Sequence, residues 1–178
     1  MNRINKDSGI PEIAAFVSEA LEDAGIDAVL SGGAAVTVYA ENPYRTGDLD
    51  FVSSAPTTQI EKVLSALGFT RYNQRYFVHE DTEYFVEFPA GPVAVGGEII
   101  RDSSEFETPV GRIKIITPTH CVMDRLAAFY HWNDPQCLDQ AIAVAKSQDV
   151  DFDVIKGWSE REGHGEKYER FRDLLKKS

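Results

Sequence analysis

Two aspartates, Asp48 and Asp50, are the residues in this 178-residue chain whose spacing points most directly to chemistry. They lie in the run Asp-Leu-Asp-Phe-Val, which reads as a strand. Because side chains alternate between the two faces of a strand, both carboxylates would point one way and Leu49 the other. Two carboxylates roughly 7 Å apart along one strand repel each other unless a cation joins them. The spacing favours a cation site, and the alternative is that Asp48 is a loop residue before the strand.

A pair of glycines, Gly32 and Gly33, precedes the aspartates in a setting that could bind phosphate. Residues 28–30 read as the end of a strand, the glycines let the backbone turn sharply, and residues 34–40 have helical character. The free backbone N–H groups at a helix start attract anions. A phosphate could therefore sit at this turn, and the alternative is an ordinary turn.

These features occur in an order that resembles a known signature. Residues 31–36 read Ser-Gly-Gly-Ala-Ala-Val, and residues 45–51 read Arg-Thr-Gly-Asp-Leu-Asp-Phe. The combination resembles the polymerase-β-like nucleotidyltransferases, and looks most like the minimal nucleotidyltransferases of bacterial toxin and abortive-infection systems. The resemblance extends from about Ile26 to Asp139 and is strongest at the first motif.

The resemblance implies a particular reaction. Asp48 and Asp50, with a third acid, would hold two Mg²⁺ (or Mn²⁺) ions, one activating an acceptor hydroxyl and the other binding the triphosphate of an NTP. The hydroxyl would attack the α-phosphorus in line, and pyrophosphate would leave. The Gly32-Gly33 turn with Ser31 would hold the β- and γ-phosphates.

Glu87 is the predicted third acid. It lies in the run Tyr-Phe-Val-Glu-Phe at 84–88, and a charge in an apolar run is costly unless it is paired or coordinated. The resemblance asks for an acid on a strand beside the Asp-x-Asp strand, although family members more often carry Asp there. Glu83 has the same parity as Glu87 and is the alternative third acid. A surface carboxylate on an exposed sheet face is the other reading.

Two arginines, Arg45 and Arg125, are predicted to add positive charge beside the phosphates. In the minimal nucleotidyltransferases a helix after the last strand carries Lys-Leu-x-Ala and the next helix carries an Asp, and Arg125-Leu-Ala-Ala and Asp139 match those places. A guanidinium can grip a phosphate but cannot act as a base. Only a phosphate contact is therefore carried over to Arg125, and an ion pair with Asp124 or Asp139 is the alternative.

The periodicity of apolar residues predicts the elements that position these groups. The first part alternates helix and strand: a helix from Pro11 to a stop at Gly25, a strand over 26–30, the two motifs, and a helix that Thr58–Glu61 would start as a capping box. Short strands then suggest an antiparallel meander, over 69–72, 75–79, 83–88, 93–95 and 112–116. Helices follow, with Pro118 and Pro135 in the first turns of two of them and two more over 151–162 and 166–177.

We therefore predict an α+β fold with a nucleotidyltransferase-like mixed β-sheet flanked by helices and a C-terminal helical extension. Residues 1–117 would form the core. Residues 118–178 would pack on it, because each helix there has one apolar stripe that needs a partner surface.

Composition limits where this protein would be located in the cell and what it would bind. A hydrophobic fraction of 43% is enough for a core, and no run approaches the roughly 18 apolar residues of a membrane span. The N-terminus lacks the apolar core of a signal peptide, so we expect a cytoplasmic protein without a membrane partner. Cys121 and Cys137 are expected to be reduced packing thiols. The net charge of −11 argues against a broad phosphate-binding face and favours a small nucleotide held with metal ions, or a partner that carries its own positive charge.

The expected function is therefore a nucleotidyltransferase that transfers an NMP from an NTP to an acceptor hydroxyl. The acceptor is open among a protein, a tRNA end and a small molecule, and a toxin-like member would have a cognate antitoxin as partner. The alternative is a catalytically weak or inactive module that keeps the fold and binds a nucleotide or a partner.

Overall fold

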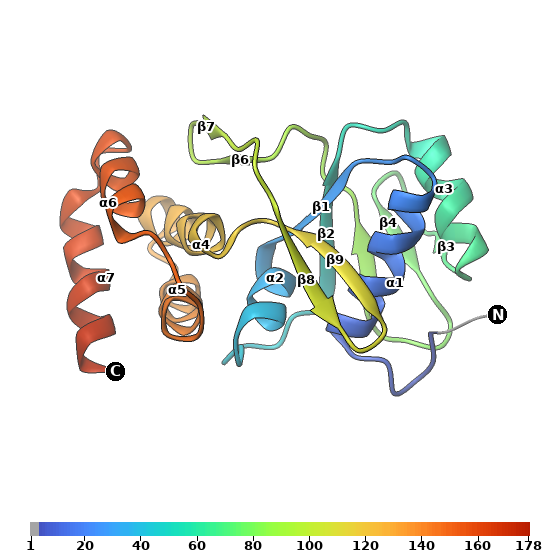
Figure 1. The fold of residues 1–178 in the computed structure, drawn as a ribbon, viewed down its shortest axis with the longest axis horizontal. Helices are drawn as coiled ribbons and strands as arrows, with labels where there is room; N and C mark the ends of the chain where they lie inside the picture. The colour runs from blue at the N-terminus through green and yellow to red at the C-terminus, as the bar shows by residue number, and fades with distance from the viewer. Residues whose placement is uncertain (1–3) are drawn as a thin grey trace.

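The computed structural model describes residues 4–178 and shows a mixed β-sheet with helices around it (Figure 1). The helices are α1 (Ile10–Asp23), α2 (Gly32–Tyr39), α3 (Thr57–Ala66), α4 (Pro118–Trp132), α5 (Pro135–Ser147), α6 (Phe152–Arg161) and α7 (Gly165–Lys177). The strands are β1 (Ala28–Ser31), β2 (Asp48–Ser53), β3 (Thr70–Arg71), β4 (Tyr76–Val78), β5 (Phe85–Glu87), β6 (Ala94–Val95), β7 (Glu98–Ile99), β8 (Ser104–Thr108) and β9 (Gly111–Ile115). The predicted α+β class is confirmed.

The main sheet has the strand order β3-β4-β5-β2-β1-β9-β8. β2 is antiparallel to β1 and parallel to β5, while β9 is parallel to β1. The predicted meander is therefore right only for the antiparallel run β3-β4-β5. It is wrong for β6, which pairs with β7 in a separate two-stranded sheet, and for β9, which crosses to the far side of β1. Ile113 and Ile115 explain the crossing, because both are fully buried there beside the central strands.

Helix starts follow the sequence signals with one exception. Thr117 and Asp134 cap α4 and α5, accepting the backbone N–H groups of His120 at 3.1 Å and Gln136 at 2.9 Å. The predicted capping box at Thr58 is wrong, because α3 begins after Pro56 with no side-chain cap, and its Glu61 instead forms an ion pair with Arg71.

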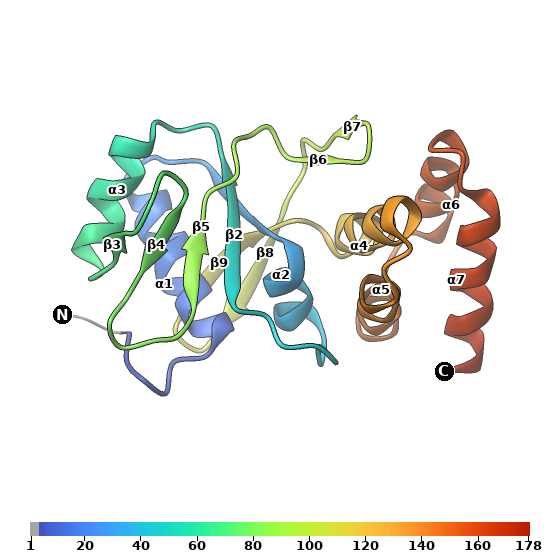
Figure 2. The same cartoon turned by 180° about the vertical axis from the view of Figure 1, so that it is seen from behind.

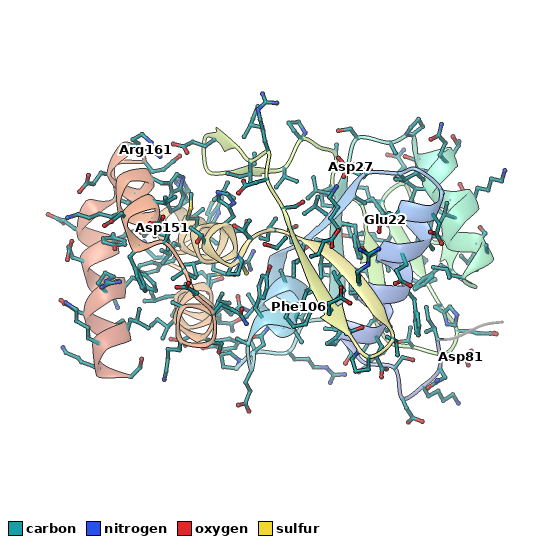
Figure 3. All side chains as sticks on the ribbon, viewed as in Figure 1. Glu22, Asp27, Asp81, Phe106, Asp151 and Arg161 are labelled. Carbon is teal, nitrogen blue, oxygen red and sulfur yellow. The ribbon has the colours of Figure 1, made fainter. Side chains whose placement is uncertain are left out.

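The helices divide between the two sides of the molecule. α1 and α3 contact each other, and α1 packs on β1 and β9. α2 lies between the sheet and the helices α4 and α5, with α6 and α7 beyond them (Figures 1 and 2). The Tyr39 hydroxyl of α2 donates to the carbonyl of Ile116 at 2.7 Å, and its ring meets Phe106 of β8 edge-on with centroids 5.8 Å apart. Phe106 is labelled beside α2 in Figure 3. Both contacts hold α2 from the side of β8 and β9.

Two further features of the described chain bear on the sequence predictions. Cys121 and Cys137 are free buried thiols, as predicted. Among residues 4–178, no helix combines the length and the apolar character that crossing a bilayer requires.

Candidate functional site

Strand pairing brings the glycine turn and the acids into one row across the sheet. Asp50 on β2 lies opposite Ser31 at the end of β1, and on its other side it lies opposite Glu87 of β5. On the remaining face of β2, Leu49 and Phe51 are fully buried, so the strand shows the alternation that was predicted. The row runs over three neighbouring strands, from the turn to the third acid.

Three carboxylates converge at this row. Asp48, Asp50 and Glu87 each offer an oxygen, and these oxygens all lie within 4.8 Å of one another. Glu87 is only 9% exposed, and both aspartates are partly buried. Carboxylate oxygens are the ligands that Mg²⁺ and Mn²⁺ favour, so this set of donors fits a divalent cation.

The crowding of negative charge changes the protonation of Asp50. Burial raises its pKa to about 7 from 3.8, with further increases from the charges of Asp48 and Glu87 and from a hydrogen bond with the Glu87 carboxyl. The positive charge of Arg125 acts in the opposite direction. Without a cation, the cluster relieves its repulsion by holding a proton.

Glu87 and Glu83, the two candidates for the third acid, have different surroundings. β5 begins only at Phe85, so Glu83 precedes the strand. Glu83 is exposed and forms an ion pair with Arg45, which is also exposed. Glu87 faces Asp50 across the strand pair, and Nη2 of Arg75 lies 2.8 Å from Oε1 of Glu87. The geometry therefore brings Glu87, and not Glu83, to the two aspartates.

The glycine turn fits closely against the acids. Gly32 has a φ of +67°, and a Cβ there would lie 2.6 Å from Oδ2 of Asp50. A Cβ on Gly33 would lie 2.6 Å from the hydroxyl oxygen of Thr46. The Ser31 hydroxyl donates to the backbone carbonyl of Asp50 at 3.4 Å. Gly32 thus lets the backbone at the start of α2 approach the Asp50 carboxylate, and Gly33 leaves room for the Thr46 side chain.

Side chains that sequence reasoning missed tie this turn to α5. The amide of Asn42 donates to the carbonyl of Gly33 at 3.3 Å and to the Thr37 hydroxyl at 3.0 Å. Gln140 of α5 donates to Asn42 at 3.3 Å, and its oxygen accepts from Arg125 at 3.4 Å. An Asn two or three residues after a helix is a common loop residue, so no signal in the sequence marks Asn42.

Neither predicted arginine contacts the carboxylates directly. Arg45 pairs with Glu83 at the surface, as described above. Arg125 is largely buried and binds Asp124 through Nε at 3.0 Å and Nη2 at 2.5 Å, which was the alternative reading. Burial opposes its charge, but Asp124 outweighs burial and the pKa of the guanidinium is raised. Asp139 instead accepts from the Tyr44 hydroxyl at 2.5 Å.

The arrangement as a whole combines an acid cluster with the free N–H groups of a helix start. α2 begins at Gly32, and the first four N–H groups of a helix have no partner within it. An anion at the turn and a cation among the carboxylates would therefore be neighbours. Such a pair suits a metal-bound phosphate ester.

Comparison with known proteins bears on the fold of the chain. No family model and no curated protein sequence matches the chain. Among solved structures it is similar to an antigenic nucleotidyltransferase-like protein from Paracoccidioides brasiliensis, at 13% identity over 80% of this chain and 78% of that one, with a TM-score of 0.58. It is also similar to ANT(2″)-Ia in complex with adenylyl-2″-tobramycin, at 12% identity over 94% of this chain and 97% of that one, with a TM-score of 0.49. The first of these likenesses shows that the chain has a nucleotidyltransferase-like fold, which the resemblance of its motifs predicted.

Proposed function

We propose that this protein is a metal-dependent nucleotidyltransferase, which moves an NMP from an NTP to an acceptor hydroxyl and releases pyrophosphate. The observation that carries the proposal is the convergence of Asp48, Asp50 and Glu87 within 4.8 Å, directly beside the glycine turn. Carboxylates that repel one another at a partly buried site are costly to a fold, so their presence together favours a functional role.

The acids would act by holding a cation and receiving a proton. Mg²⁺ or Mn²⁺ bound there would supply a lower pKa for the acceptor hydroxyl and charge neutralisation for the triphosphate. An ionised carboxylate oxygen of the cluster that does not bind the cation would be close enough to accept the proton of the hydroxyl.

The glycine turn would hold the leaving phosphates. The N–H groups of Gly32 and Gly33 lie at the start of α2, where the helix dipole also favours an anion. The Ser31 hydroxyl already donates to the Asp50 carbonyl and would have to exchange that bond to reach a phosphate. The two backbone N–H groups would therefore provide most of the binding.

The arginines would act at longer range. The positive charge of Arg125 already lowers the pKa of Asp50, so it would also attract a triphosphate bound beside the cluster. Arg45 would have to leave Glu83, and because both side chains are exposed that separation costs little.

Residues 118–178 would complete the site as a helical extension packed on the core of residues 1–117. The hydrogen bonds that join Gln140 to Asn42, and Asn42 to the carbonyl of Gly33, support this role, because they hold the phosphate-binding turn from the side of α5.

The second candidate is a module on the same fold that binds a nucleotide or a partner without efficient catalysis. The engagement of Arg125 by Asp124 and of Glu87 by Arg75 favours it, since both groups would otherwise face the substrate. A toxin-like role with a cognate antitoxin depends on the motif at 45–51 alone.

The experiment that tests the function is incubation with each labelled NTP in turn, with Mg²⁺ or Mn²⁺ and a cell extract as acceptor. Release of pyrophosphate and labelling of one acceptor class are expected. Asp48→Asn should abolish both signals, and Glu83→Gln should keep them. Binding of NTP without pyrophosphate release under any condition would favour the second candidate.

A further inference from the structure

A small apolar groove lies on the sheet beside the carboxylates. It has a volume of about 270 Å³ and is lined by Tyr72, Asn73, Tyr76, Val78 and Phe85. Tyr76 and Phe85 meet edge-on with ring centroids 5.2 Å apart, which fixes the floor of the groove. Tyr72 is 75% exposed and Val78 is 39% exposed. Large apolar side chains exposed together are typical of a binding surface.

Strand register places this groove on the same face of the sheet as the acids. Phe85 lies opposite Asp48, and Tyr76 lies opposite Glu87. The other face is marked by Phe77 of β4, which is fully buried. Since residues directly opposite each other in neighbouring strands share a face, the groove continues the acid row toward the edge of the sheet.

The order of the strands decides which substrate reaches this groove. In an in-line displacement, the attacking and the leaving oxygens lie on opposite sides of the phosphorus. The Gly32-Gly33 turn follows β1 on one side of β2, whereas β5, β4 and β3 lie on the other side. If the turn holds the leaving phosphates, the acceptor must approach from the side of β5, where the groove is.

The lining of the groove selects the chemistry of the acceptor. None of its five side chains is charged, and Arg75, which precedes Tyr76 in the chain, forms an ion pair with Glu87. Asn73 is held there because its oxygen accepts from the backbone N–H groups of Arg75 at 2.9 Å and Tyr76 at 3.0 Å, which leaves its NH₂ group for a ring acceptor atom. The volume is near the lower end of ligand sites, which span roughly 300–1,000 Å³, so it suits one ring system.

We propose that this groove, here named the ring groove, binds the base of a nucleoside-like acceptor whose sugar hydroxyl is the attacking group. This proposal depends on the proposed function. Neighbouring strands are about 4.8 Å apart, so the ring groove over β3 and β4 is roughly 5–10 Å from the Glu87 carboxylate. A hydroxyl attached directly to the ring does not span that distance, whereas a sugar between the base and the hydroxyl does.

The reaction balances without a further reactant. The sugar oxygen forms a bond to the α-phosphorus, the bond from that phosphorus to the bridging oxygen breaks, and pyrophosphate leaves. The proton of the hydroxyl passes to a carboxylate oxygen of the acid cluster. The product is two nucleosides joined by a phosphodiester.

Nucleoside binding to the full chain, without NTP or metal, tests the ring groove independently of catalysis. The probes are adenosine, guanosine, cytidine and uridine. Their binding is measured in NMR titrations by saturation transfer from the protein to the protons of the base. Stacking of a base on an aromatic side chain is strong enough that Tyr72→Ala should weaken binding roughly 5- to 100-fold. Trp132→Ala is the matched control, since Trp132 is 82% exposed on α4, away from β3 and β4, and it should change nothing.

Three outcomes would overturn the proposal. One is nucleoside binding equally tight in wild type and Tyr72→Ala, and another is no nucleoside binding at all. The third is Tyr72-dependent binding of N-acetyltyrosinamide but not of nucleosides, which would indicate a protein side chain as acceptor.

A parallel melting experiment with Mg²⁺ and each of the four NTPs keeps the two proposals distinguishable. A thermal shift with any NTP and Mg²⁺ but no nucleoside binding would reject the ring groove and leave the proposed function. Tyr72-dependent nucleoside binding without a shift for any of the four NTPs would reject the proposed function and retain the groove as a binding site. When both succeed, wild type given the stabilising NTP and a nucleoside should form the mixed phosphodiester, and Tyr72→Ala should form it only at higher nucleoside concentration.

Discussion

Asp50 lies where the three carboxylates and the Gly32 backbone meet, and its protonation links the site to the stability of the fold. Its pKa in the folded protein is about 7, above the 3.8 of a free carboxyl. The folded state therefore binds this proton more tightly than the unfolded state does. Its stabilising contribution is complete below about pH 4 and is lost as the pH rises through 7.

The first prediction concerns Asp50→Asn in the presence of EDTA. The substitution removes both the cost of burying the Asp50 charge and its repulsion from Asp48 and Glu87, so above pH 8 the free energy of unfolding of the variant should exceed that of wild type by about 1–4 kcal/mol. The gap should close toward pH 4. Urea melts between pH 4 and pH 9 measure it, and a variant less stable than wild type at pH 8 would contradict the electrostatic account.

The second prediction adds ligand to the same variant. If metal and nucleotide bind the folded state and not the unfolded state, an NTP with Mg²⁺ at about 100 times Kd should stabilise wild type by roughly 2.7 kcal/mol. Asp50→Asn should lose most of this gain because it removes a cation ligand. Thermal melts with each of the four NTPs provide the measurement, and curves unmoved by any NTP with metal would count against the site.

The third prediction separates the two candidate acids. Glu87→Gln should keep the apo fold and reduce nucleotide transfer by more than the roughly 10- to 100-fold that changes outside the ligand shell cause. Glu83→Gln is the matched control: its side chain is exposed, and only the surface pair with Arg45 is lost. The stability and the turnover of Glu83→Gln should therefore stay close to those of wild type. An active Glu87→Gln beside an inactive Glu83→Gln would reverse the assignment.

At the scale of elements, the start of α2 depends on a glycine for two separable reasons. Gly32 and Gly25 have similar positive φ values, +67° and +71°, but a Cβ on Gly32 would meet Asp50 whereas none of the described atoms lies within 4 Å of one on Gly25. A side chain at either position would therefore strain the backbone. The close approach to the carboxylate belongs to Gly32 alone.

The fourth prediction uses this pair. Gly25→Ala and Gly32→Ala should each destabilise the protein by about 1–2 kcal/mol, the cost of a left-handed alanine. Only Gly32→Ala should also lose stabilisation by NTP and Mg²⁺, because the Asp50 carboxylate must rotate away from the new methyl group. Equal NTP-dependent shifts in the two variants would show that the turn is not part of the site.

The same scale shows what the sequence could predict. The alternation of Asp48 and Asp50 and the glycine turn depend on local spacing, and the structure has both. The choice between Glu87 and Glu83 required strand register, which is set by where β5 begins and by pairing with β2 and β4. The alternation of side chains alone placed Glu83 and Glu87 on the same face of the strand. β8 escaped prediction because Phe106 is the one large apolar residue among its five positions.

At the scale of the whole molecule, the C-terminal helices connect to the site through both packing and hydrogen bonds. α4 and α5 contact α2, and the fully buried residues of α4 include Val122 and Leu126. Gln140 reaches Asn42, which in turn holds the carbonyl of Gly33. The long-range pairing of Gln140 with Asn42 has no sequence signal, because the two residues meet only after α5 has packed against α2.

The fifth prediction tests whether these helices are needed by the core. A fragment of residues 1–117 would expose the surface of α2 that α4 and α5 cover, and exposed apolar surface of that kind favours association. We expect the fragment to aggregate or to lose a cooperative melt, as followed by light scattering and circular dichroism. Gln140→Ala in the full chain is the control for the hydrogen bonds alone, and should leave the fold intact with weaker stabilisation by NTP and Mg²⁺. A soluble fragment with a cooperative melt and unchanged nucleotide binding would show instead that residues 1–117 form an independent domain, with α4 to α7 serving another purpose.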